Sequence, residues 1–287
     1  MAQAWAPFKT LKNSPLFTPR DFAETLDGGQ SFRWNKIGES AYEGVFENIA
    51  ARLALAENGL VKASLPKSIN ADIAAEKIAE FLDYKRDYQK IIASQTDSKA
   101  LAAAKNFPTL RILRQTPAEA IICFICSSSK RITQIKQCVA LLSQNLGDEI
   151  CEGFRALPSL QKIADAPDET LKACKLGFRA AYLKKTAQKI LSDNFDPNSL
   201  IETPYPEAKK YLLTLSGIGE KVADCILLFG AAKFEAFPVD TWISKAMANM
   251  YGLKSPSHTR AFAAQKFGKY AGYVQQLIFA DIRKKSE

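Results

Sequence analysis

The residue in this sequence best suited to covalent chemistry is Lys221, within the stretch PEAKKYLLTLSGIGEKVADCILLFG at 206–230. Both halves of the stretch have helical periodicity and SGIG at 216–219 separates them, so Lys221 falls in the first turn of the second helix. Cations are disfavoured at that positive helix end by roughly 0.3–1 kcal/mol. Because an amine attacks carbon only when it is neutral, this position favours a nucleophilic lysine. A lysine that contacts phosphate or solvent is the alternative interpretation.

A carboxylate follows nineteen residues later, at Asp240 in the segment FPVDT. An aspartate between a proline-containing loop and the helical segment TWISKAMANMYG is a good helix N-cap. The helix dipole favours negative charge there, which also suits the stabilisation of positive charge developing on a sugar. The two roles are compatible, so Asp240 is a cap and a candidate catalytic group.

Two glycines, Gly217 and Gly219, flank Ile218 at the break between the helices. They predict a tight hairpin in which Ile218 anchors in the helix pair and the backbone can approach a partner closely. The free amides at the start of the second helix form a phosphate site. The pattern is typical of the helix-hairpin-helix DNA-binding motif, and an ordinary helical hairpin with a glycine turn is the alternative.

The charge of the chain favours a polyanionic partner without identifying one. It has 39 Lys and Arg against 30 Asp and Glu, a net charge of +9 and a pI near 9.1. No apolar run reaches the length of a membrane-spanning helix, and the N-terminus has no signal-peptide stretch. The sequence therefore predicts an intracellular protein without a membrane partner, in the cytoplasm or nucleoid of a bacterium or the nucleus of a eukaryote.

Cysteine and histidine usage predicts neither a metal site nor a cofactor. Cys123 and Cys126 form a C-x-x-C inside an apolar run, but no second pair follows, and His258 is the one histidine. Four ligands at suitable spacing are therefore missing, and buried free thiols are the preferred interpretation. The absence of any cysteine after Cys225 also excludes a C-terminal cysteine-ligated iron–sulfur cluster.

Periodicity predicts an α+β fold with a change of character near residue 106. Residues 1–106 are predicted to form an antiparallel sheet domain with flanking helices, and 107–287 a mainly α-helical region. The predicted strands cover 30–34, 42–46 and 52–56. Asn58-Gly59 lies between RLALAE and LVKASL, which is a hairpin signal.

The predicted helices have recognisable ends. One begins at about residue 71, and Thr116 followed by Pro117 is the start of another, with Glu119 in its first turn. A third runs from about 132 to 146 and stops at Gly147. These breaks define short helices joined by tight turns.

Six motifs resemble, in order, the 8-oxoguanine DNA glycosylase family of the helix-hairpin-helix glycosylase superfamily, over most of the chain. They are GQSFRW (29–34), FICSS (124–128), LGFRAAY (176–182), GEKVADC (219–225), PVD (238–240) and YAGYVQQLIFAD (270–281). The resemblance implies a bifunctional DNA glycosylase and AP lyase of base-excision repair, which excises 8-oxoguanine through a lysine Schiff base. It also implies double-stranded DNA containing oxidised guanine as the partner, and a monomer.

The resemblance assigns roles to individual residues. Lys221 matches the family's nucleophile, which attacks C1′ of the extruded nucleotide, and Asp240 matches its catalytic aspartate. Four positions match the family's substrate-binding residues. The Gly29 carbonyl would accept the N7 hydrogen of 8-oxoguanine, and Gln275 would bind the Watson–Crick edge of the base. Phe279 and Cys225 would form the two walls between which the base lies. Each also has a structural alternative, as a strand opening, a solvated helix residue or core.

The resemblance implies further contacts to the DNA itself. The matching positions are Ser129, Gln134, Phe178, Arg179, Gly217, Gly219, Val222 and Trp242. Four of them depart from the family pattern: Ser129 replaces an asparagine, Gln134 an arginine, Phe178 a wedge tyrosine and Trp242 a histidine. The base pocket and the chemistry are thus retained, whereas selectivity for the base opposite the lesion is expected to be loosened.

Two other functions remain open from the residues. A water-using alkylpurine DNA glycosylase of the same superfamily would not need Lys221. A non-enzymatic helix-hairpin-helix DNA-binding protein would use Lys221 for phosphate alone and would need neither Asp240 nor a pocket.

Overall fold

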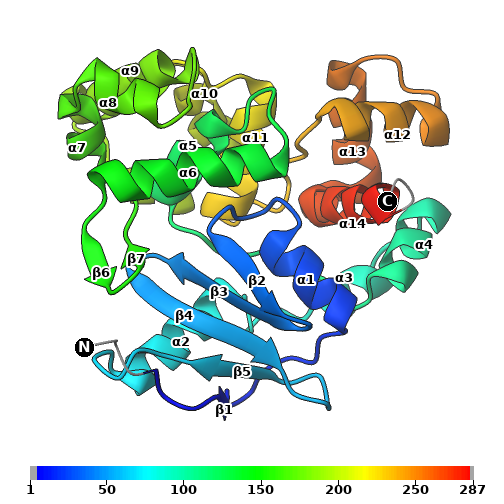
Figure 1. The fold of residues 1–287 in the computed structure, drawn as a ribbon. Coiled ribbons are helices and arrows are strands. Elements are labelled where there is room, and N and C mark those ends of the chain that lie inside the picture. The colour runs from blue at the N-terminus through cyan, green and yellow to red at the C-terminus, as the bar shows by residue number, and fades with distance from the viewer. Residues whose placement is uncertain (1–4, 285–287) are drawn as a thin grey trace.

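The computed structural model describes residues 5–284 and has an antiparallel sheet on one side of a larger group of helices (Figure 1). The predicted α+β class is confirmed. The main sheet has the strand order β1-β5-β4-β3-β2, with every neighbouring pair antiparallel. Its strands are β1 (Lys9–Thr10), β2 (Trp34–Gly38), β3 (Ala41–Phe46), β4 (Ile49–Leu55) and β5 (Val61–Ser64).

One helix lies between β1 and β2, and the other helices follow β5 along the chain (Figure 1). Those of the first part are α1 (Pro19–Asp27), α2 (Ala71–Phe81), α3 (Tyr88–Ala93) and α4 (Ser98–Asn106). The central group is α5 (Pro117–Cys126), α6 (Ile132–Leu146), α7 (Leu160–Asp165), α8 (Asp168–Ala173), α9 (Arg179–Ser192), η1 (Pro197–Ile201), α10 (Tyr205–Leu212) and α11 (Glu220–Gly230). The C-terminal group is α12 (Thr241–Tyr251), α13 (Pro256–Phe267), η2 (Gly268–Tyr270) and α14 (Ala271–Lys284).

Local signals placed several of these elements correctly. Asn58-Gly59 joins β4 to β5, with Gly59 at φ +79° and the Asn58 side chain accepting the amide of Leu60 at 3.2 Å. Thr116 caps α5 by accepting the amide of Glu119, and α6 ends immediately before Gly147. These elements form where one residue satisfies a turn or a free helix end.

The strand predicted at 30–34 is wrong, because regular pairing begins only at Trp34. Gln30 is fully buried, and its side chain makes two backbone hydrogen bonds of the kind that a neighbouring strand would make. Its amide donates to the carbonyl of Arg111 at 2.8 Å and accepts from the amide of Leu113 at 2.9 Å. The alternation of residues 30–34 therefore belongs mostly to a bent loop, which the Gln30 side chain anchors.

A second difference lies inside the helical region. A short two-stranded sheet, β6 (Glu149–Cys151) with β7 (Phe154–Arg155), follows α6 and was not predicted. It packs near β3 and β4, and Cys151 joins Val45 and Ala50 in a small apolar cluster. Two strands of three and two residues are too short for a periodic signal.

Buried residues form two principal cores. One holds α1, α2 and the inner face of the sheet around Trp34, and the other holds the helices from α3 onward. Because Tyr88 and Phe107 belong to the helical core, we propose that the change of core lies near residue 85, ahead of the predicted boundary after residue 106. A buried ion pair between Arg33 and Glu119, at 3.7 Å, connects the two parts.

Across residues 5–284, the helices are all too short or too polar to cross a membrane.

The buried Gln30 side chain predicts a stability effect. Gln30→Ala leaves a buried carbonyl and a buried amide unpaired, at about 1–3 kcal/mol each. We expect the free energy of unfolding to fall by about 2–6 kcal/mol in urea denaturation. Gln89→Ala is the matched control, because the Gln89 amide makes one solvent-exposed bond to the Pro108 carbonyl at 2.8 Å. Equal losses in the two variants would contradict the anchoring role of Gln30.

Candidate active site

The two helices predicted around the glycine hairpin are α10 and α11. Gly217 has φ +78°, and a Cβ there would lie 2.7 Å from Cβ of Tyr182, so both the turn and the packing require glycine. Ile218 is buried in the helical core as predicted. Gly219 is exposed, caps α11 and has open space in front of it. The hairpin therefore presents bare backbone to a partner.

Lys221 is the second residue of α11 and the last before the helix becomes buried. Its side chain is half-buried. The amine donates to Oγ of Ser127 at 3.2 Å and lies 5.7 Å from the ring centroid of Phe124. The Lys221 amine is therefore held at a defined place by the end of α5.

Asp240 is the N-cap of α12, as predicted. Its Oδ1 accepts the amide of Ile243 at 2.8 Å, and its side chain is half-buried. Two helices thus direct their positive ends, at Lys221 and Asp240, toward the same space.

That space is a cleft of about 1300 Å³, which continues into a narrow pocket of about 50 Å³. The predicted catalytic and substrate-binding residues all line the narrow pocket, although they are far apart in sequence. They are Gly29, Lys221, Cys225, Asp240, Gln275 and Phe279. The pocket is well below the roughly 300 Å³ of an ordinary small-molecule site, so its walls must move to admit a ring system.

Two residues of the narrow pocket, Gln275 and Cys225, carry uncharged polar side chains. Gln275 is 5% exposed, and its Oε1 has no hydrogen-bond partner among the described residues. Burial raises the pKa of the Cys225 thiol to about 11, while the nearby Lys221 opposes the rise, so the thiol is neutral at physiological pH. An unpaired buried amide oxygen is costly unless a ligand or water donates to it.

The turn that carries Gly29 is tied to α14 by a hydrogen bond from Arg283. Gly29 itself has φ +98°, which favours glycine, and the preceding Gly28 carbonyl accepts Nη1 of Arg283 at 2.7 Å. Arg283 also lies 5.9 Å from the ring of Phe279. Helix α14 therefore positions both the turn and one wall of the pocket.

Five of the eight positions predicted to contact DNA line the large cleft. They are Ser129, Gly217, Gly219, Val222 and Trp242. The side chain of Val222 is buried, so it can offer a ligand only its backbone amide, which is free in the first helical turn. Trp242 is 45% exposed in the first turn of α12.

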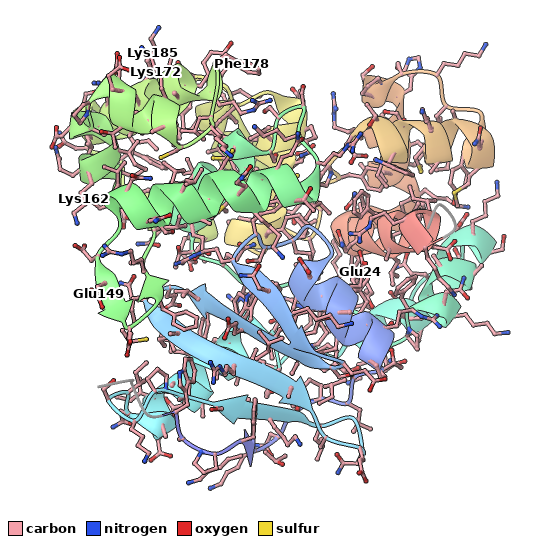
Figure 2. All side chains as sticks on the ribbon, viewed as in Figure 1. Glu24, Glu149, Lys162, Lys172, Phe178 and Lys185 are labelled. Carbon is pink, nitrogen blue, oxygen red and sulfur yellow. The ribbon has the colours of Figure 1, made fainter. Side chains whose placement is uncertain are left out.

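The other three positions lie outside the cleft lining. Phe178 is 59% exposed and lies at the rim of the helical part near α9 (Figure 2). Gln134 is exposed on the first turn of α6, where its Oε1 accepts the amide of Arg131 at 3.0 Å. Arg179 is buried, and its guanidinium donates to the carbonyls of Ser128 and Leu176. In this structure Arg179 therefore braces the loop after α5.

Sequence reasoning missed four residues of the site: Ser127, Phe229, Pro238 and Gln276. Ser127 lies in the FICSS motif, but nothing in its spacing indicates contact with Lys221, 94 residues later. Gln276 adjoins Gln275 and has a buried, unpaired Nε2. Such contacts arise from packing between helices.

All six cysteines lie within residues 5–284, and each is a buried free thiol, as predicted. In the described part of the chain, no cluster of His, Cys, Asp and Glu has the size of a metal site.

Comparison with known proteins defines the class to which this site belongs. Residues 89–269 match the model of the HhH-GPD superfamily of base excision DNA repair proteins, and residues 17–121 match the N-terminal domain of 8-oxoguanine DNA glycosylase. The chain is thus a helix-hairpin-helix base excision repair protein. Within that superfamily, it belongs to the 8-oxoguanine DNA glycosylase family.

Individual relatives agree with this assignment. The chain is 31% identical to the N-glycosylase/DNA lyase OGG1 of Arabidopsis thaliana, over 96% of this chain and 79% of that one. It resembles the Clostridium acetobutylicum 8-oxoguanine glycosylase/lyase bound to double-stranded DNA with cytosine opposite 8-oxoguanine, at TM-score 0.86, 29% identity and 99% coverage of both chains. The 3-methyladenine DNA glycosylase of Archaeoglobus fulgidus shares the fold, at TM-score 0.76 and 17% identity over 97% of this chain and 99% of that one.

The tight packing at the hairpin predicts a stability difference between two glycines. Gly217 and Gly153 have similar angles, φ +78° and +82°, but an added Cβ meets Tyr182 only at Gly217. Gly153→Ala should cost about 1–2 kcal/mol of unfolding free energy from backbone strain. Gly217→Ala should cost about 1–3 kcal/mol more from overpacking. Urea denaturation measures both, and equal losses would show that Tyr182 yields without cost.

Proposed function

We propose that this protein is a bifunctional DNA glycosylase and AP lyase that excises 8-oxoguanine from duplex DNA, with the Lys221 amine as nucleophile. The observation that carries the proposal is the shared pocket, where Lys221 and Asp240 stand beside Gly29, Gln275 and the walls. Relatives and structural neighbours that bear this activity in their names, at 29–31% identity, support it.

The chemistry requires the damaged nucleotide to leave the duplex, since C1′ is inaccessible inside the stack. The lone pair of the neutral Lys221 amine forms a bond to C1′, while the electrons of the glycosidic bond leave with the base, which takes up a proton. The C1′–O4′ bond then breaks as a C1′=N bond forms, and O4′ takes up a proton lost by the amine, which gives a Schiff base. Removal of a C2′ proton then breaks the C3′–oxygen bond and releases the 3′ phosphate.

Asp240 stabilises positive charge in the proposed mechanism. Its carboxylate lines the same pocket as Lys221, where positive charge develops on the sugar as the base departs. The cap bond to Ile243 fixes the carboxylate, so little reorganisation is needed when the charge appears.

The narrow pocket supplies groups that can recognise the base. The unpaired Oε1 of Gln275 is free to accept from its Watson–Crick edge, and the Gly29 carbonyl is the proposed acceptor for the N7 hydrogen of 8-oxoguanine. Phe279 is half-buried and is the wall best able to move, with the neutral thiol of Cys225 as the other wall.

The DNA backbone is proposed to dock where the amides of α11 and α12 open on the cleft, beside Gly217, Gly219, Val222 and Trp242. Phe178 is proposed as the wedge. Ser129, Gln134 and Arg179 are the proposed opposite-strand contacts, and Arg179 must leave its carbonyl partners to reach a base. The monomeric state and the cellular compartment stay predictions.

The two alternative functions differ from this proposal at Lys221. The fold itself is shared with an alkylpurine glycosylase, so it does not discriminate. A water-using enzyme has no use for an amine held in the pocket, and a binding module has no use for the pocket. Borohydride reduction on duplexes with 8-oxoguanine, an alkylated purine or no lesion separates the three, because only a lysine Schiff base is trapped covalently.

Lys221→Gln tests the nucleophile directly. We expect the covalent adduct, base removal and strand nicking to be lost while DNA binding persists, because the phosphate site consists mainly of backbone amides. Lys99→Gln is the matched control, since Lys99 is the second residue of α4 and its loss removes the same charge. If Lys221→Gln excised the base at a rate near that of the unchanged protein, Lys221 would not be the nucleophile.

Asp240→Asn separates catalysis from capping. Asn caps helices about as well as Asp, so the free energy of unfolding should change little. Base removal in single turnover should fall on the order of 10²–10³-fold. Asp87→Asn is the control, because Asp87 caps α3 through the same kind of bond away from the cleft. A loss of activity matched by an equal loss of folded protein would make Asp240 purely structural.

A further inference from the structure

The hydroxyl of Ser127, at the C-terminal end of α5, contacts the Lys221 amine from a remote part of the chain. The distance from Nζ to Oγ is 3.2 Å. Ser127 is 7% exposed and lines the cleft. The resemblance gives Ser127 no role, although it belongs to one of the matching motifs.

The direction of this hydrogen bond is fixed by a second one. Oγ of Ser127 donates its single proton to the carbonyl of Phe124 at 2.7 Å. Because that proton is used, Oγ can only accept from Nζ of Lys221. The amine is therefore the donor in this contact, whether it is charged or neutral.

This direction has a consequence for the neutral amine, which has two N–H bonds and one lone pair. If one N–H points at Ser127, the lone pair cannot point there. Cys225, one turn along α11, lines the narrow pocket together with Lys221. Because one N–H is directed to the α5 side, the lone pair is left to the side of the amine that opens on the cleft.

We propose that Ser127 is a positioning residue, which accepts one N–H of Lys221 and thereby directs the amine's lone pair toward C1′ of the extruded nucleotide. This inference rests on the proposed role of Lys221 as nucleophile. In the step that it assists, the lone pair forms the N–C1′ bond as the electrons of the glycosidic bond leave with the base. Ser127 neither gains nor loses a proton in this step.

Positioning matters here because a lysine side chain has four rotatable bonds and pays for ordering in entropy. Ser127 is itself rigid, as the last helical turn and the Phe124 carbonyl define its hydroxyl direction. A displacement of about 1 Å in a reacting group can cost on the order of 10²-fold in rate.

The test is Ser127→Ala in the full chain on duplex DNA containing 8-oxoguanine. The rate constant for borohydride-trapped adduct in single turnover, at saturating enzyme, should fall on the order of 10- to 100-fold. Affinity for a duplex that carries a tetrahydrofuran abasic-site analogue should not change. Ser94→Ala is the matched control, because Ser94 follows α3 with nearly the same backbone angles, and its hydroxyl likewise donates to a carbonyl three residues earlier, at 2.7 Å.

Ser127→Thr and Ser127→Val form a second pair that differs in the hydroxyl and hardly in shape. The proposal requires faster trapping in the threonine variant, with both folded to the same extent in thermal unfolding. Equal rates for this pair, or an unchanged rate in Ser127→Ala, would overturn the positioning role and leave the proposed function intact. Absence of any adduct with the unchanged protein would instead overturn the proposed function.

Discussion

The close packing of α11 against α5 is the constraint on which the site depends. Gly230 allows the two backbones to approach, since a Cβ there would lie 2.7 Å from Cβ of Ala120. The rings of Phe124 and Phe229 stack between the helices at 5.4 Å. Every residue of α11 from Val222 onward is buried, so the register of α11 against α5 determines which residues of α11 reach the cleft. Lys221 lies at the N-terminal end of α11, which is the end that reaches the cleft.

Burial and helix dipoles act together at that end. The amides of the first turns of α11 and α12 are free of intrahelical partners and open on one cleft, which attracts phosphate. Lys221, in the first turn of α11, and Asp240, at the N-cap of α12, line this same cleft. In the proposed function, one arrangement of helices therefore serves DNA docking, the nucleophile and charge stabilisation, and the hairpin at Gly217 links α10 to α11.

The pocket also requires elements from both ends of the chain. Gln30 anchors the loop that carries Gly29 to the segment before α5, and Arg283 ties the preceding carbonyl to α14. Gln275 and Phe279, on the same face of α14, complete the lining. No strand residue lines the narrow pocket, and the loop that leads into β2 is itself held against α5 by the buried Arg33–Glu119 pair.

Local chemistry was enough to predict the glycine hairpin, the cap at Asp240, the position of Lys221 in its helix, and α6 between Ile132 and Gly147, because each depends on residues within one or two turns. The residues proposed to bind the base were predicted from the resemblance in motif order. Tertiary packing alone decided that residues 30–33 form a loop, that Arg179 turns inward to the carbonyls of Ser128 and Leu176, and that Ser127 meets Lys221. Those outcomes depend on which buried polar groups find partners across helices, and periodicity along a single chain carries no information about partners remote in sequence.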